Sequence, residues 1–168
     1  MKTKFIFFFC LISFLQNNVN AQIRKDNIII GGDIGFTSVN NGSYFGIAPE
    51  VGYLFDETFE AGLGIGYTLI TQGIAKRNLW NFSPYVNYFF SDSFYLRAKY
   101  QYLIGHETGT STSGMSINES AMWLGAGYQS INDHFIYRTG ILYNAIYNQN
   151  TSIYNSPILP FASFAYRL

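Results

Sequence analysis

Apolar and polar residues alternate along much of this chain with a period of two. In Phe59–Ile70, one parity carries apolar side chains at 59, 61, 63, 65, 67 and 69, whereas the other carries Glu60, Thr68 and glycines at 62, 64 and 66. Successive side chains of a β-strand point to opposite faces of the sheet. The pattern therefore predicts a strand with one apolar face and one face of glycine and polar groups.

The same alternation predicts eight strands in the chain. They are Ile28–Val39, Tyr44–Phe55, Phe59–Ile70, Leu79–Phe90, Phe94–Gly105, Glu119–Gln129, Phe135–Tyr147 and Pro157–Leu168. Each has about 10 to 13 residues, the length that a tilted strand needs to cross a bilayer. Strands of soluble proteins average only about 5–6 residues. The strand length therefore favours a membrane-spanning sheet.

The connections between these strands alternate in length. Three are tight and polar, namely Asp56–Thr58, Ser91–Ser93 and Asn132–His134, and four are longer, namely Asn40–Ser43, Thr71–Asn78, His106–Asn118 and Asn148–Ser156. Short periplasmic turns and longer extracellular loops are typical of outer-membrane barrels. The fold class predicted is therefore all-β, an eight-stranded antiparallel up-and-down transmembrane β-barrel.

The charged residues within the predicted strands all fall on the parity opposite to the apolar one. The predicted polar network of the lumen consists of Asp33, Glu50, Glu60, Arg97, Lys99 and Arg138, and Arg167 has the same parity. A basic residue that faced lipid at mid-bilayer would cost about 2–4 kcal/mol. An eight-stranded barrel is only wide enough for its own side chains, so the inward glycines leave room for these long polar groups.

The first 21 residues predict a signal peptide that is removed. Lys2 and Lys4 precede the apolar run Phe5–Leu15, and the segment ends in Val19-Asn20-Ala21, which suits a signal peptidase. The run is too short for a transmembrane helix, which needs roughly 20 residues. We therefore expect residues 22–168 to form one outer-membrane β-barrel domain, and we expect the protein in the outer membrane.

Composition narrows the class of protein further. Without the signal peptide the chain has eight basic residues against ten acidic ones and no cysteine, because Cys10 lies in the apolar run. Nothing in this balance favours nucleic acid as a partner. Aromatic residues make up 19% of the chain and charged residues 12%, about half of the usual 25%. An aromatic-rich, charge-poor secreted chain suits the outer membrane.

Several segments together resemble a known family. They are NAQ at Asn20–Gln22, IAPEVGYLFDETFEAGLGIGY at Ile47–Tyr67, SPYVNYFFSDSFYLRAKY at Ser83–Tyr100 and FASFAYRL at Phe161–Leu168. The chain resembles the small eight-stranded outer-membrane barrels of the OmpA/OmpX type, in particular the Bacteroidetes-like outer membrane protein beta-barrel domain family. The resemblance implies membrane lipids and lipopolysaccharide as surroundings. It also implies recognition of the last strand, where Phe164, Tyr166 and Leu168 alternate, by the outer-membrane insertion machinery.

The favoured function is non-enzymatic: a barrel with a packed polar lumen that has a structural role or binds a surface partner through extracellular loops such as Gly109–Ser116.

Three alternatives stay open. The first is a narrow, low-conductance pore through the inward charges. The second is an outer-leaflet lipid A deacylase that uses His106, with Thr108, Ser111, Ser113 and Glu119 nearby; such chemistry needs a hydroxyl, a base and an orienting carboxylate. The third is a soluble lipocalin-like carrier, which would need an apolar interior.

No cofactor or metal site is expected. The two histidines, His106 and His134, lie on opposite predicted rims, and no cysteine is available to complete a ligand cluster.

Overall fold

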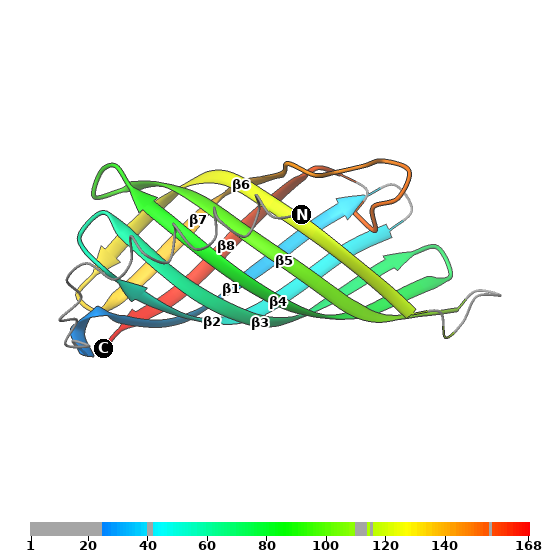
Figure 1. The fold of residues 1–168 in the computed structure, drawn as a ribbon, viewed down its shortest axis with the longest axis horizontal. Helices are drawn as coiled ribbons and strands as arrows, with labels where there is room; N and C mark the ends of the chain where they lie inside the picture. The colour runs from blue at the N-terminus through cyan, green and yellow to red at the C-terminus, as the bar shows by residue number, and fades with distance from the viewer. Residues whose placement is uncertain (1–24, 40–41, 110–113, 115, 155) are drawn as a thin grey trace, which may run out of the picture.

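The chain forms a closed barrel of eight antiparallel strands, in which each strand pairs with the next and the last pairs with the first (Figure 1). This is a computed structural model, and it describes residues 25–39, 42–109, 114, 116–154 and 156–168. The predicted fold class is confirmed. The expected signal peptide, residues 1–21, lies outside the described residues, as do Ser111 and Ser113.

A short 3-10 helix (η1, Lys25–Asn27) precedes the barrel. The strands are β1 (Ile28–Val39), β2 (Gly42–Leu54), β3 (Phe59–Gln72), β4 (Ala75–Phe89), β5 (Phe94–Thr108), β6 (Ser116–Asn132), β7 (Phe135–Asn144) and β8 (Ile158–Arg167). Among the described residues, no helix is long and apolar enough to cross a membrane.

The expected loop Thr71–Asn78 is wrong. Thr71 pairs with Lys76 and Gln72 with Ala75, so β3 and β4 meet in a two-residue hairpin. Gly73 occupies the left-handed region there, with φ of 59°, a conformation that glycine adopts without steric cost. The alternation rule missed this hairpin because Lys76, Arg77 and Asn78 are polar on both faces, which conceals the period of a strand.

β7 is shorter than predicted. It ends at Asn144 rather than Tyr147, and residues 145–157 form the longest connection in the described chain. β5 and β6 are longer than predicted at the same end of the barrel, because His106 pairs with Ser116.

The two rims of the barrel differ. The turn rim carries the connections 55–58, 90–93 and 133–134. It also carries the first residues of β1 and the last residues of β8. The loop rim carries the connections 40–41, 73–74, 109–115 and 145–157.

At the turn rim, the Thr58 hydroxyl and backbone N–H donate to Asp56 Oδ1 at 2.7 Å. These bonds stabilise the carboxylate and lower the pKa of Asp56.

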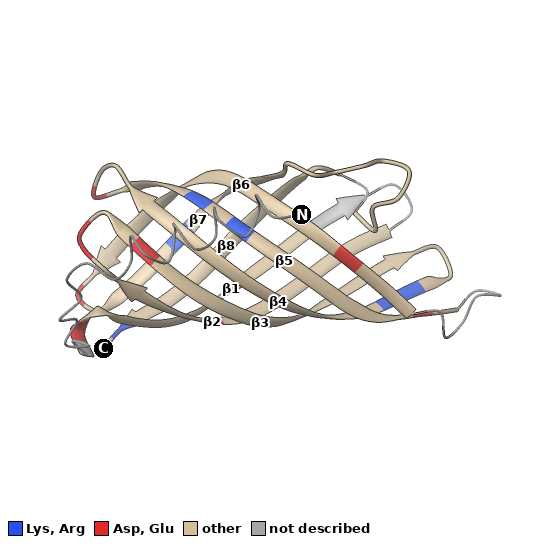
Figure 2. Cartoon of the chain, in the orientation of Figure 1, with Lys and Arg blue, Asp and Glu red and all other residues tan. Residues whose placement is uncertain are grey.

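The outer wall is apolar between the rims, and the charged side chains lie at the rims or inside. Ile65 and Trp80 are 64% and 65% exposed on the outer face, whereas Glu60 and Arg97 are buried. Figure 2 shows that basic and acidic residues occupy only short parts of the strands, which are otherwise free of charge. An apolar exterior around a polar interior is the reverse of what a soluble lipocalin-like carrier needs.

The inward glycines of β3 make room for side chains from other strands. A Cβ added at Gly62 would lie 2.6 Å from the Tyr85 ring, and one at Gly64 would lie 3.0 Å from both Glu50 Cγ and Ser83 Oγ. Any larger residue there would collide with the groups that fill the lumen.

Candidate functional site

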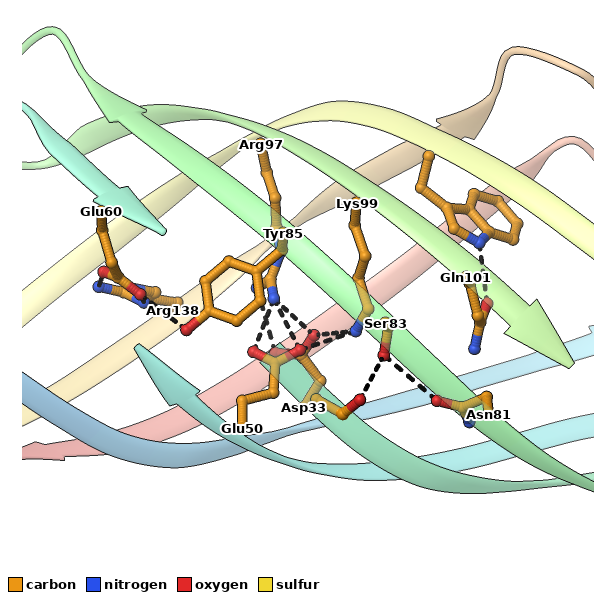
Figure 3. A network of polar contacts seen from close by, with 12 residues as sticks. Asp33, Glu50, Glu60, Asn81, Ser83, Tyr85, Arg97, Lys99, Gln101 and Arg138 are labelled. Atoms are coloured by element: carbon orange, nitrogen blue, oxygen red, sulfur yellow. Dashed lines mark hydrogen bonds and ion pairs between the residues drawn. The ribbon is translucent and has the colours of Figure 1, made fainter. Parts of the chain in front are cut away.

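A four-group ion cluster crosses the middle of the lumen (Figure 3). Asp33 comes from β1, Glu50 from β2, and Arg97 and Lys99 from β5. Arg97 Nη2 lies 2.6 Å from Glu50 Oε2 and 3.0 Å from Asp33 Oδ2. Lys99 Nζ lies 2.8 Å from Asp33 Oδ2 and 2.8 Å from Glu50 Oε1. Each cation therefore contacts both carboxylates, and β5 is tied to the opposite wall.

A second ion pair lies nearer the turn rim. Arg138 on β7 donates from Nη2 to Glu60 Oε2 at 2.5 Å and from Nη1 to Glu60 Oε1 at 3.1 Å. This two-point geometry is the strongest form of ion pairing between an arginine and a carboxylate. Arg138 Nε also donates to Gln129 Oε1 at 3.3 Å.

Tyr85 on β4 connects the two charge groups. Its hydroxyl donates to Glu60 Oε1 at 2.9 Å, and the Arg97 guanidinium carbon lies 4.5 Å from the centre of its ring. A guanidinium over an aromatic face gains cation–π attraction while it remains free to bond at its edge. The six charged groups thus form one connected arrangement along the lumen.

The arrangement is electrically balanced. Three carboxylates (Asp33, Glu50 and Glu60) face three cations (Arg97, Lys99 and Arg138), and all six are buried. A buried charge without a partner costs several kcal/mol. Balance is therefore a condition for a stable barrel.

The loop end of the lumen is closed by the connection between β7 and β8. Tyr154 from this segment enters the barrel, where it is 5% exposed. Its hydroxyl donates to Gln101 Oε1 at 2.8 Å, and the Trp123 indole N–H donates to the same oxygen at 2.9 Å. The Tyr154 ring lies 5.0 Å from the Trp123 ring, edge to face, and 5.6 Å from the Tyr44 ring. We call the described residues of this connection, 145–154 and 156–157, the plug segment.

A carboxylate on β6 holds the plug segment in place. Glu119 accepts hydrogen bonds from the Ser152 hydroxyl and from the Ile153 backbone N–H, each at 2.6 Å. Asn144 Oδ1 accepts from the backbone N–H groups of Met122 and Ile146, each at 3.2 Å. These bonds hold Ile146, Ser152 and Ile153 of the segment against the wall.

The space left inside is small. A cavity of about 30 Å³ lies beside the ion cluster, lined among others by Asp33, Lys99, Gln101 and Trp123. Such a volume holds roughly two water molecules. At the turn end, Ile29, Ile136 and Ala165 form a separate buried apolar group with Leu54.

The described residues of the deacylase alternative do not come together. His106 is exposed on the outer wall, opposite Ser116 of β6. Glu119 pairs with Leu103, which is fully buried, so its carboxylate lies on the inner face, where the plug segment uses both oxygens. The Thr108 hydroxyl donates to the Lys76 backbone carbonyl at 3.3 Å. Within the described residues, no group of three or more His, Cys, Asp or Glu side chains could hold a metal ion.

Sequence reasoning missed the plug. It assigned the inward charges from parity, but Tyr154 lies in a connection where no period of two exists to give its direction. In the sequence, Glu119 stands out only by its spacing from His106. The one available signal was the apolar pair Ile153-Tyr154 within an otherwise polar loop.

The geometry is that of a small transmembrane barrel, and comparison with solved structures supports this class. The chain is similar to the N-terminal beta-barrel domain of Pseudomonas aeruginosa OprF, with a TM-score of 0.55 and 12% identity over 83% of this chain and 96% of that domain. Weaker likenesses are to a de novo designed transmembrane beta-barrel (TM-score 0.45, 12% identity, 84% of this chain and 94% of that one) and to Yersinia pestis Ail (0.45, 14%, 83% and 99%).

The chain therefore has the fold of the small eight-stranded outer-membrane β-barrels, as its resemblance to the OmpA/OmpX type indicated. No model of a known protein family matches the chain, and no curated protein does. At these identities the likeness concerns the fold, which by itself does not define a function.

Proposed function

We propose that this protein is an integral outer-membrane barrel with a closed lumen, which is neither an enzyme nor a pore and acts in the envelope through its stability and its loops. The observation that carries the proposal is the succession of closures along the axis: the apolar group at the turn end, two balanced ion groups, and the plug segment. In this orientation the loop rim faces outward, as in other outer-membrane barrels.

A planar-bilayer recording of the refolded protein tests the closed lumen. We expect no steady conductance from the native barrel, because the ion groups and the plug lie in series. The control is Glu57→Gln, a charge change at an exposed turn. A small, charge-selective conductance of the native barrel that Glu57→Gln leaves unchanged would show a narrow pore and overturn the proposal.

Membrane location has its own test. The protein should need detergent for extraction, and the unboiled form should migrate faster in a gel than the boiled form. Extraction by carbonate alone would contradict an integral barrel. The mature protein should begin at Gln22, which peptide mass spectrometry of the membrane fraction tests. Truncation of Phe161–Leu168 should prevent recognition by the insertion machinery.

The deacylase alternative is tested by mass spectrometry of lipid A from cells with and without the protein. We expect identical spectra, because His106 and the Glu119 carboxylate lie on opposite faces of the wall. Loss of an acyl chain that His106→Ala restores would make the protein an enzyme.

A further inference from the structure

The strands themselves form a concave apolar seat at the loop end of the lumen. Tyr44 of β2 and Trp123 of β6 are buried there, and they belong to one cluster with Leu142 of β7 and Leu159 of β8. Gln101 of β5 adds one polar group, because its Oε1 accepts the Trp123 indole N–H at 2.9 Å (Figure 3). That bond comes from the wall and orients Gln101 independently of the plug segment. An apolar hollow with a fixed polar group is typical of a small-molecule site.

Tyr154 of the plug segment occupies this seat. Its ring lies edge to face against Trp123 and tilted against Tyr44, with centroids 5.0 Å and 5.6 Å apart. Its hydroxyl donates to Gln101 Oε1 at 2.8 Å. Aromatic pairs of this geometry attract each other beyond the area they bury. The seat therefore selects an aromatic ring through its neighbours and a hydroxyl through its acceptor, which together describe a phenol.

Space remains beside the residues that hold Tyr154. The cavity of about 30 Å³ is lined by Tyr44, Gln101 and Trp123, and also by Lys99, which is buried. Such a volume holds roughly two water molecules. A ring that carries a further small polar substituent can therefore be accommodated next to the seat.

The plug segment crosses the side of the mouth where the wall is lowest. β6 pairs with β5 from Ser116 onward, but with β7 only from Trp123 onward. β1 pairs with β2 as far as Val39, but with β8 only as far as Gly35. On this side the chain between β7 and β8 is the plug segment (orange in Figure 1). It can therefore move outward without separating a pair of strands.

Few bonds hold the part of the plug segment that enters the barrel. Among the described residues, the stretch 148–154 is joined to the strands by the two hydrogen bonds to Glu119 and the one from Tyr154 to Gln101. Within this stretch only Ile153 and Tyr154 are buried. A ligand that competes with one buried side chain can make such a minor open state the dominant one.

We propose that the loop end of the lumen binds a small neutral phenol, which takes the seat of Tyr154 and keeps the plug segment outside. Tyr154 is an internal competitor that fills the site in the free protein. The ligand is neutral because the nearby cation Lys99 is already paired with Asp33 and Glu50. The four-group ion cluster is not displaced, so the lumen stays closed to ions. The inference thus goes beyond the closed-lumen proposal, which the conductance recording tests separately.

Thiol labelling of the folded barrel in detergent tests this site. Residues 22–168 contain no cysteine, so Ile153→Cys introduces a single thiol, which is buried while the plug segment is in place. The probe is p-cresol, which has the structure of a tyrosine side chain. At about ten times its dissociation constant for the open form, it should raise the rate of maleimide labelling about ten-fold, because it stabilises only that form. The related compound p-methylanisole has no hydroxyl to donate to Gln101 and should leave the rate nearly unchanged.

Ile136→Cys is the matched control, because Ile136 is also a buried isoleucine but lies at the turn end. Its labelling should not respond to p-cresol. A response at both positions would show that the phenol loosens the whole barrel, and the site would be overturned.

The remaining outcomes decide the chemistry of the ligand. Unchanged labelling of Ile153→Cys in p-cresol would contradict the proposal, as would an equal response to p-methylanisole. Adding Gln101→Met to Ile153→Cys removes the acceptor and should abolish the response to p-cresol, whereas a response that persists would contradict recognition of the hydroxyl. The mobility shift of a folded barrel verifies each variant. The comparison of the two compounds on Ile153→Cys decides the proposal even if the Gln101→Met variant does not fold.

Discussion

Glu119 receives a hydrogen bond from the Ser152 hydroxyl at 2.6 Å, and through it the wall of the barrel holds the segment that closes it. The same carboxylate accepts from the Ile153 backbone N–H. Directly after Ile153, Tyr154 reaches Gln101 inside the lumen. One carboxylate at the rim thus holds the stretch of chain that places an aromatic ring inside the barrel.

Replacing Glu119 with alanine should release the plug segment. Hydrogen bonds to a charged acceptor contribute about 1.5–3 kcal/mol each, so the open population should rise at least ten-fold. Chymotrypsin should then cleave after Tyr154, which is protected in the native barrel, and the intact masses of the fragments identify the bond cut. Glu57→Ala, at an exposed turn, is the control. Equal cleavage rates in the two variants would show that Glu119 does not hold the segment.

Removing Arg97 should destabilise the barrel strongly. Arg97→Met leaves Asp33 and Glu50 with Lys99 alone, and breaking a buried ion group in this way costs about 3–5 kcal/mol. Urea unfolding in detergent, followed by the mobility shift, measures the loss. The double variant Arg97→Met/Glu50→Gln restores the balance of charge and should lose less than the two single variants added together. Simple additivity would show that the groups act independently.

Asn87 is a polar residue whose removal should stabilise the protein. It is fully buried on the inner face of β4, and neither its amide nitrogen nor its oxygen has a hydrogen-bond partner among the described residues. Replacing an unpaired buried polar group with an apolar one of similar shape removes a penalty of about 1–3 kcal/mol. Asn87→Val should therefore raise the urea midpoint, whereas Asn81→Val, which breaks the bond between Asn81 Nδ2 and Thr68 Oγ1, should lower it.

The period of two was sufficient to predict the barrel, because lipid outside and packed side chains inside impose opposite demands on alternate residues. Asp33, Glu50, Arg97 and Lys99 lie in the lumen for that reason. Their pairing could not be predicted, since it depends on registers across β1, β2 and β5 that the turns and the barrel's closure determine together.

The loop rim was predicted least well. At the loop ends of β4 and β5 both faces of the strand are polar, because the outer face carries Lys76 and His106 and the inner face carries the ion pair of Arg77 with Glu107. The alternation that marks a strand therefore disappears. The plug segment follows no period at all. Its inward direction comes from the fit of Tyr154 between Tyr44 and Trp123, which exists only after the barrel has closed.

A charge placed on the outer wall should measure how deeply each strand lies in the membrane. Ile65 is at the middle of β3 and is well exposed, so Ile65→Arg should cost about 2–4 kcal/mol when the protein folds into lipid vesicles. The same change at Glu57, on the turn rim, should cost less than about 1 kcal/mol, because near the interface the side chain reaches water. Urea titrations in vesicles give both values. If the two variants lose equal stability, β3 does not cross the bilayer. A large loss for Ile65→Arg alone would show that the outward side chains in the middle of β3 face the hydrocarbon of the membrane.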